Sequence, residues 1–369
     1  MKLADLFPPT IDGSVYLEIT HRCNYNCKHC YVRSPQNREM PLERAIQIID
    51  ILKQNKFRKI IITGGEPLLH PNIKEIIEYV KKNGFKLVLI TNGTLVKETN
   101  IDYSLLDAAY VSFDGSTEEE YRLLRGKEGL AKAEEAIKYL ASIGVKVSIG
   151  CILSKFNVNK INELIKKLNT LPADKITVTI PQPFGRTLEN KEIMLSPEEY
   201  NQCIPILAQA ENIHFESMLC YPMELRNESE EISNAPLFEK YMSGCAAGKK
   251  FIYISPEGFV TPCGYVTADK NFMELTANIT EKSLEEVYDT ELFQFYMNRS
   301  WESVTGKCTK CDYNIVCKGG CPLRSHYLKG NAKLPDPWCS NEPIKNQYVQ
   351  ISNVKLKNFV KIEKVVEVC

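Results

Sequence analysis

The chain has 369 residues, of which 44% are hydrophobic and 25% are charged, and its 46 basic side chains balance its 46 acidic ones. This length exceeds one average domain, and a neutral charge without a basic stripe argues against nucleic acid as a partner. No apolar run is long enough to span a membrane, and residues 1–10 lack a signal-peptide core, so we expect a cytoplasmic protein with no membrane partner.

The first half of the sequence alternates between strand-like and helix-like segments. β-Branched runs predict strands at Val15–Thr20, Lys59–Thr63, Lys86–Thr91, Tyr110–Asp114, Val145–Leu153 and Lys175–Ile180. Apolar residues at three- and four-residue spacing predict helices at Pro41–Gln54, Asn72–Asn83, Leu130–Ser142 and Asn157–Leu168, with a fainter helical pattern at Asn100–Asp107. The alternation indicates an α/β protein with a parallel sheet, open or barrel-like, whose ligands bind at the carboxyl ends of the strands.

The regular alternation ends after the sixth strand. Residues 197–210 predict one further helix with Ser196 as its N-cap, and Pro205 is expected to bend this helix or end it early. The polar, acidic segment 227–236 is predicted as a linker. We therefore expect domains at 1–235 and 236–342, followed by a charged helical tail at 343–369.

Three of the 14 cysteines lie on the loop that follows the first strand. Cys23, Cys27 and Cys30 form the pattern C-x3-C-x2-C. In a reducing compartment, such thiols serve as metal ligands rather than as partners in disulfides. A [4Fe-4S] cube held by three cysteines has one iron without a protein ligand, which a substrate can chelate. A zinc site is the alternative, since His21 or His29 can supply a fourth ligand.

Polar residues follow two further strands. The turn Thr63-Gly64-Gly65-Glu66-Pro67 ends the second strand, and Ser112 and Asp114 lie at the end of the fourth. Taken alone, Gly-Gly-Glu-Pro is simply a good turn. Its place one βα unit after the cysteine loop indicates that the two segments form one site at the strand ends.

The cysteine loop and this turn together resemble the signature of the radical S-adenosylmethionine (SAM) superfamily, over roughly residues 12–235. The resemblance implies a partial (β/α)6 TIM-like barrel in which a [4Fe-4S] cluster on Cys23, Cys27 and Cys30 binds SAM. One electron then cleaves SAM to methionine and a 5′-deoxyadenosyl radical, which takes a hydrogen atom from the substrate. By the same resemblance, SAM is bound by Gly64, Gly65, Glu66, Ser112, Asp114 and Arg125. Arg125 is expected to pair with the SAM carboxylate, with Arg122 as the alternative.

Seven cysteines in the second half form another pattern: Cys245, Cys263, Cys308, Cys311, Cys317, Cys321 and Cys339. Paired zinc ribbons are the alternative, but only Cys308 and Cys311 form a C-x2-C knuckle. The pattern resembles the SPASM domain of radical SAM peptide maturases, over about residues 240–340.

This second resemblance implies two auxiliary [4Fe-4S] clusters, and therefore three clusters in the chain. One auxiliary cluster is held by Cys308, Cys311, Cys317 and Cys339, and the other by Cys245, Cys263 and Cys321. No cysteine occurs in residues 236–244, so the second cluster either has an open iron or uses Cys220. Cys151 and Cys203 are expected in the core.

These resemblances predict an enzyme that modifies a ribosomally made peptide by hydrogen abstraction. It would take electrons from an external one-electron reductant of the ferredoxin or flavodoxin type. Because only about a dozen residues precede the first strand, we expect either a separate leader-peptide-binding protein or an exposed edge strand of this chain to hold the peptide. The alternative is a small-molecule substrate, a tetrapyrrole of the haem or haem d1 pathway, indicated by residues 183–186 and 336–339.

Two further classes are disfavoured. An iron–sulfur scaffold has no need of a SAM pocket. Sulfatase-maturating enzymes place an aspartate base where this chain has Gly264, so we set that type aside and assign no catalytic base.

Overall fold

The computed structural model describes residues 13–32, 38–215, 245–268, 270–311 and 314–339. The chain divides into two compact units. Among the described residues, the sheet unit comprises 13–32, 38–215, 246–268 and 270–298, and the cysteine unit comprises 245, 299–311 and 314–339. The predicted linker, the predicted domain boundary after residue 235, Cys220 and the predicted tail lie outside the described residues.

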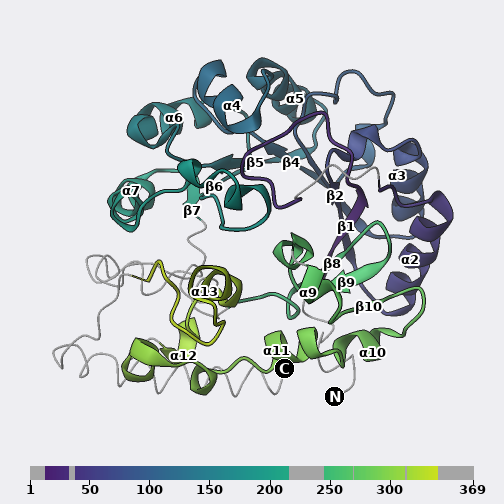
Figure 1. Ribbon diagram of the computed structural model, residues 1–369. Coiled ribbons are helices and arrows are strands. Elements are labelled where there is room, and N and C mark those ends of the chain that lie inside the picture. The colour runs from purple at the N-terminus through teal and green to yellow at the C-terminus, as the bar shows by residue number, and fades with distance from the viewer. Residues whose placement is uncertain (1–12, 33–37, 216–244, 269, 312–313, 340–369) are drawn as a thin grey trace, which may run out of the picture. The chain divides into compact units, whose positions relative to one another are not determined.

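Ten strands of the sheet unit form one sheet in the order β10-β9-β8-β1-β2-β3-β4-β5-β6-β7. Their bounds are β1 Ser14–Thr20, β2 Lys59–Gly64, β3 Lys86–Thr91, β4 Ala108–Ser112, β5 Lys146–Ile152, β6 Lys175–Thr179, β7 Ile213–Phe215, β8 Phe251–Ile254, β9 Phe259–Thr261 and β10 Ala277–Asn278. Neighbours from β8 to β7 are parallel, whereas β9 and β10 add in antiparallel fashion. The sheet curves without closing, which makes it the expected partial barrel (Figure 1).

Helices cover the outer face of this curved sheet (Figure 1). They are α2 Leu42–Gln54, α3 Ile73–Lys82, α4 Glu118–Arg125, α5 Leu130–Ser142, α6 Ile161–Leu168 and α7 Pro197–Gln209. Along β1, Val15, Leu17 and Ile19 are fully buried. Because side chains alternate between the two faces of a strand, these three share one face of β1 and form part of the core.

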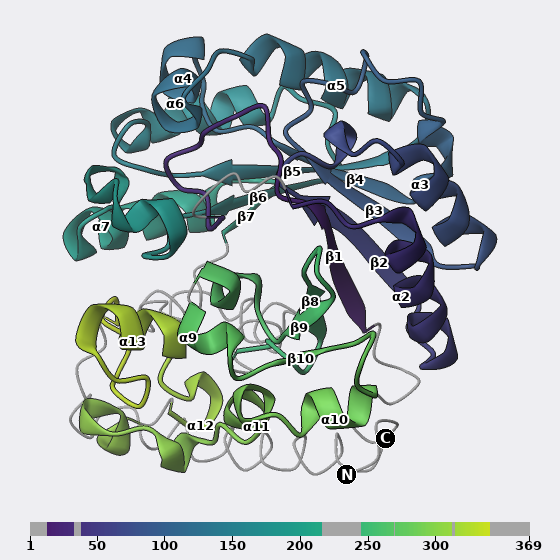
Figure 2. The ribbon, with the colours of Figure 1, turned by 45° about the vertical axis from the view of Figure 1, so that its right-hand side comes forward.

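The other face of the sheet forms the inner wall of the barrel. Strand register places Tyr16 beside Ile61 on β2 and beside Tyr253 on β8. The rings of Tyr16 and Tyr253 are stacked with centroids 4.3 Å apart. Figure 2 shows β8 next to β1, with β9 beyond it, so a segment from the second half of the chain completes this side of the barrel.

The six predicted strands correspond to β1–β6, and the parallel α/β fold is confirmed. Several details of the prediction were wrong. The fourth strand ends at Ser112, and Asp114, two residues beyond its end, binds Arg125. The helix expected over residues 157–168 begins with a 3-10 turn, and only Ile161–Leu168 is α-helical. Residues 100–107 contain only a 3-10 turn at Tyr103–Leu105.

Helix α7 excludes one of the two expectations for Pro205, an early helix end. Ser196 caps it as predicted, in a capping box with Glu199. Pro205 lies inside the helix, which continues to Gln209. Helix α4 and the strands β7–β10 were not predicted, since these segments are too short to show a clear period.

The remaining elements are short. In the sheet unit they are α9 Lys270–Met273, α10 Leu284–Tyr288 and α11 Glu291–Met297, and in the cysteine unit they are α12 Asn314–Cys317 and α13 Pro322–Lys329. Among the described residues, no helix is both long and apolar enough to cross a membrane.

Candidate functional site

A cavity of about 200 Å³ lies at the carboxyl ends of the barrel strands. It collects most of the residues predicted to act together: Cys23, Cys27, Cys30, Gly64, Gly65, Ser112 and Arg125 all line it. Glu66 and Asp114 do not line the cavity, and both are fully buried behind its wall. Among the described residues, the parallel fold therefore brings these segments together where a parallel sheet binds its ligands.

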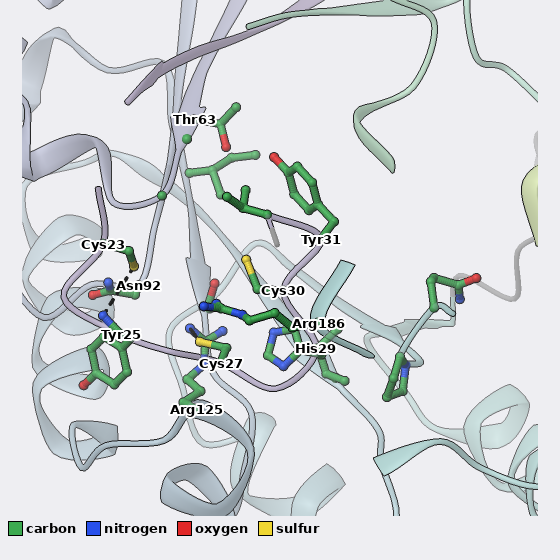
Figure 3. A pocket seen from close by; sticks show the side chains of 18 of the residues that line it. Cys23, Tyr25, Cys27, His29, Cys30, Tyr31, Thr63, Asn92, Arg125 and Arg186 are labelled. Atoms are coloured by element: carbon green, nitrogen blue, oxygen red, sulfur yellow. Dashed lines mark hydrogen bonds between the residues drawn. The ribbon is translucent and has the colours of Figure 1, made fainter. Parts of the chain in front are cut away.

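The cysteine loop is held in place by backbone hydrogen bonds from several elements. The amide of Gly65 donates to the carbonyl of Thr20 at 2.6 Å, and that of Glu66 donates to Arg22 at 2.8 Å. The amide of Arg186 donates to the carbonyl of Cys30 at 2.8 Å. Figure 3 shows Cys23, Cys27 and Cys30 around one common opening.

The three thiols provide a donor set that suits an iron–sulfur cube. Burial raises the pKa of Cys23 to about 11 and that of Cys27 to about 12. Such thiols need a cationic partner to become thiolates, and metal binding supplies one. Their buried position in one cavity therefore fits a bound metal cluster.

The zinc alternative places a different geometric demand on the thiols. A zinc ion needs its cysteine ligands about 2.3 Å from a single point, whereas a cube distributes its ligands over different irons.

The glycines of the second turn allow close packing against the cysteine loop. A Cβ atom on Gly64 would lie 2.2 Å from the Thr20 carbonyl oxygen, and one on Gly65 would lie 2.2 Å from the Arg22 carbonyl oxygen. Any larger residue would push the cysteine loop out of position. The expected approach of these glycines to SAM remains a prediction, and their contact with the loop is an additional role.

Glu66 joins the ends of two strands. Its Oε1 accepts from the Leu68 amide at 3.2 Å and from the Thr91 hydroxyl at 2.7 Å, while its Oε2 accepts from the Asn92 amide at 2.8 Å. Burial raises the pKa of this carboxyl group above its usual value, although the three donors oppose that shift. The carboxylate thus shapes the cavity wall from behind.

Arg125 lies at the end of α4 and forms a buried ion pair with Asp114. Its Nε and one terminal nitrogen both lie 2.6 Å from Asp114 Oδ2, and Asp114 Oδ1 accepts from the Ile152 amide at 2.8 Å. The remaining terminal nitrogen points to Cys27 Sγ at 3.9 Å. Burial opposes the charge on Arg125, but Asp114, Tyr121 and Cys27 together outweigh it and hold the pKa of the guanidinium well above its usual value.

Arg122, the alternative partner for the SAM carboxylate, also lies on α4. Arg122 is exposed and does not line the cavity.

His29 lines the cavity, and its Nε2 lies 3.8 Å from Asp114 Oδ2. Burial lowers the pKa of His29 to about 4, so its ring is neutral at physiological pH.

A cluster on the side of the cavity near β1 was not predicted from the sequence. The Tyr31 hydroxyl donates to Glu18 Oε1 at 2.5 Å, and Glu18 is fully buried on β1. Tyr31 packs edge-on against Tyr265, with ring centroids 5.8 Å apart, and Tyr265 packs against Phe184 at 4.8 Å. The position of Tyr31 directly after Cys30 was the only available signal, because Glu18 looks like an ordinary strand residue.

Within the cysteine unit, four predicted ligands influence one another's charge. Burial raises the pKa of Cys308 to about 11 and that of Cys317 to about 12, with Cys339 contributing to both shifts and Cys311 to the first. Such mutual effects require proximity, as expected for one cluster.

The other predicted auxiliary set divides between the two units. Cys245 contributes to the raised pKa of Cys321, which burial brings to about 11. Cys263 follows β9 in the sheet unit. Cys151 and Cys203 are buried in the sheet unit, as expected of core residues.

Comparison with known proteins agrees with this geometry. The sequence matches the radical SAM superfamily over residues 17–168 and an iron–sulfur cluster-binding domain, SPASM, over residues 245–312. It is 30% identical to an AdoMet-dependent heme synthase of Methanosarcina barkeri, covering 88% of this chain and 95% of that protein. It is 27% identical to the subtilosin biosynthesis protein AlbA of Bacillus subtilis, covering 89% and 71%.

The fold is also similar to a solved structure. SuiB of Streptococcus suis, bound to its precursor peptide SuiA, matches with a TM-score of 0.69 and 19% identity, over 91% of this chain and 76% of that one.

Proposed function

The chain belongs to the radical SAM superfamily and carries a SPASM domain, and on this premise we propose that it modifies a ribosomally made peptide by hydrogen abstraction. The observation that carries this proposal is the single cavity lined by Cys23, Cys27 and Cys30 and by the glycine turn at Gly64–Gly65. The three cysteines would hold a [4Fe-4S] cluster, which together with bound SAM supplies the 5′-deoxyadenosyl radical.

The protein's own residues position these groups and shield them. Glu66 holds the ends of β2 and β3 in register beside the cysteine loop. Arg125, fixed by Asp114, directs one N–H toward Cys27, where a hydrogen bond to sulfur would tune the cluster's potential. Tyr31 and Tyr265 line the cavity with apolar ring surface, which limits the access of water.

The chemistry of the cavity favours a peptide over a polycarboxylate. Two arginines line it, and Arg125 is neutralised by Asp114, which leaves only Arg186, bound to the neutral Asn26 side chain, for a substrate carboxylate. A tetrapyrrole with several propionates would require cations for its carboxylates. The similarity to AlbA supports a peptide substrate as well.

The second candidate is a tetrapyrrole of the haem pathway. It is favoured by the 30% identity to an AdoMet-dependent heme synthase that the chain covers almost completely. Arg186 is the residue of the cavity best suited to one propionate, since its Nε has no partner among the described residues.

Anaerobic reconstitution with iron and sulfide tests the shared machinery. We expect about twelve irons per chain for three cubes, and release of 5′-deoxyadenosine from SAM in the presence of a reductant. A triple Cys23→Ala, Cys27→Ala, Cys30→Ala variant should lose about four irons and all 5′-deoxyadenosine. Wild-type protein that binds zinc at this loop, or that leaves SAM intact once its clusters are loaded, would contradict the proposal.

The substrate class requires a separate measurement. Peptides encoded beside the gene and haem precursors with free propionates should be incubated in parallel with enzyme, SAM and reductant. We expect a mass change in a peptide and none in the tetrapyrroles. The reverse result would establish the second candidate.

A further inference from the structure

A buried ion pair in the cysteine unit connects Arg324 and Asp336. The Arg324 side chain is 0% exposed and that of Asp336 is 1% exposed. Arg324 Nε donates to Asp336 Oδ1 at 2.7 Å, and a terminal nitrogen donates to Oδ2 at 2.5 Å. The guanidinium also stacks on the Trp338 ring at 4.1 Å. A bidentate ion pair of this kind holds both side chains in one orientation.

The same carboxylate binds the backbone of two separate loops. The amide of Cys321 donates to Asp336 Oδ2 at 2.8 Å. The amide of Trp338 donates to Oδ1 at 3.0 Å, and the amide of Cys339 donates to the Asp336 carbonyl at 3.1 Å. One side chain therefore sets the backbone at Cys321 and at the residues that lead to Cys339.

Close packing leaves little freedom around this contact. A Cβ atom on Gly320 would lie 2.6 Å from Asp336 Cβ, and Gly320 has a φ of +76°. The Asp336 amide in turn donates to the carbonyl of Gly319 at 3.2 Å. The segment 319–321 and the segment 336–339 are thus packed directly against each other.

Under the proposed ligand sets, Cys321 and Cys339 serve different auxiliary clusters. We propose that Asp336 is a positioning residue shared by both, so that its loss removes both auxiliary clusters together. This inference rests on the proposed assignment of the cluster ligands. Its physical basis is that each oxygen of one carboxylate holds one cysteine-bearing segment, with Arg324 fixing the orientation of the carboxylate.

The test is the iron and sulfide content of Asp336→Asn, with electron paramagnetic resonance of the reduced clusters as a second readout. The asparagine NH2 group then faces N–H donors that the carboxylate oxygens accepted, so part of the hydrogen-bond network around residue 336 is lost. We expect iron to fall about threefold, from about twelve to about four per chain, with the signal of the SAM-binding cluster retained. Because the predicted ligands of that cluster lie in the sheet unit, its signal reports whether the sheet unit of the variant is folded.

Two matched variants serve as controls for this result. Glu302→Gln makes the same carboxylate-to-amide change at an exposed residue of the cysteine unit and should keep about twelve irons. Cys311→Ser removes a ligand of one cluster and should keep about eight.

Asp336→Asn that retains about eight or about twelve irons overturns the shared role. If Asp336→Asn also loses the SAM-binding cluster, the deciding variant is Arg324→Lys. Lysine keeps the positive charge but cannot form the bidentate pair with Asp336. Loss of both auxiliary signals in Arg324→Lys supports the inference, and loss of one or neither refutes it. A wild-type protein with only about four irons would instead refute the ligand assignment itself.

Discussion

Arg125 directs two nitrogens to a single oxygen of Asp114 and its third toward the sulfur of Cys27. The other oxygen of Asp114 accepts the amide of Ile152, just where β5 ends. The chain of contacts from β5 through Asp114 and Arg125 to Cys27 is therefore continuous. It ties one predicted cluster ligand to the rigid frame of the sheet.

Asp114→Asn should weaken this chain of contacts. The amide leaves the buried guanidinium without its counter-charge, and removing one partner of a buried ion pair costs about 3–5 kcal/mol. We expect the free energy of unfolding to fall by this order and the midpoint potential of the SAM-binding cluster to shift. Denaturant unfolding and a redox titration followed by electron paramagnetic resonance measure the two effects. An unchanged potential would mean that the Arg125–Cys27 contact has no electronic role.

Gly185→Ala should disturb the cysteine loop directly. Gly185 has a φ of +55°, and a Cβ there would lie 2.3 Å from the Tyr31 carbonyl oxygen and 2.5 Å from that of Cys30. Because these are backbone atoms, the loop must move. We expect loss of about one third of the iron, corresponding to one cube of three.

The control for this change is Gly84→Ala. Gly84 also has a positive φ, +82°, but nothing lies within 4 Å of its added Cβ. It should cost about 1 kcal/mol of backbone strain while the iron content stays at the wild-type level. Equal iron loss in both variants would show that strain alone, rather than contact with the loop, is responsible.

Glu66→Gln should be destabilising, and the size of the effect should depend on pH. The new amide group must face at least one N–H or O–H donor, which costs about 1–3 kcal/mol. Burial places the folded-state pKa of Glu66 above its ordinary value of 4.5. Protonation then favours the folded state, so this contribution is full below the unfolded pKa and is lost as pH rises through the folded one.

The difference in unfolding free energy between wild type and Glu66→Gln should therefore shrink as pH rises. Urea unfolding of both proteins from about pH 5 to about pH 8 measures it. A difference that grows with pH would indicate that the three donors, rather than burial, dominate at Glu66.

Tyr31→Phe removes a donor from the buried Glu18 carboxylate. Leaving that oxygen with fewer partners costs about 1–3 kcal/mol, and the cavity wall beside Cys30 should loosen. The matched control is Tyr79→Phe, in which the lost hydroxyl donates to Asp50 at 2.9 Å in a half-buried contact between α3 and α2. Thermal unfolding should distinguish the two, with little change in the control. Similar losses in both would argue that Glu18 does not depend on Tyr31.

Local patterns in the chain were sufficient to identify much of this protein. β-Branched runs and helical spacing located β1–β6 and most of the flanking helices, because these periods are properties of neighbouring residues. The spacing of the cysteines likewise indicated which segments bind metal. Both patterns depend only on residues that lie close together along the chain.

The tertiary structure decided the partners of the buried charged groups. The expectation that Glu66 and Arg125 bind SAM stays a prediction, and only the fold reveals the protein partners that hold each of them. The pairing of β8 with β1 and the contact of Tyr31 with Glu18 were equally invisible in the sequence. These contacts join residues that only chain folding brings together, and hydrogen-bonding capacity alone does not specify which donor meets which acceptor.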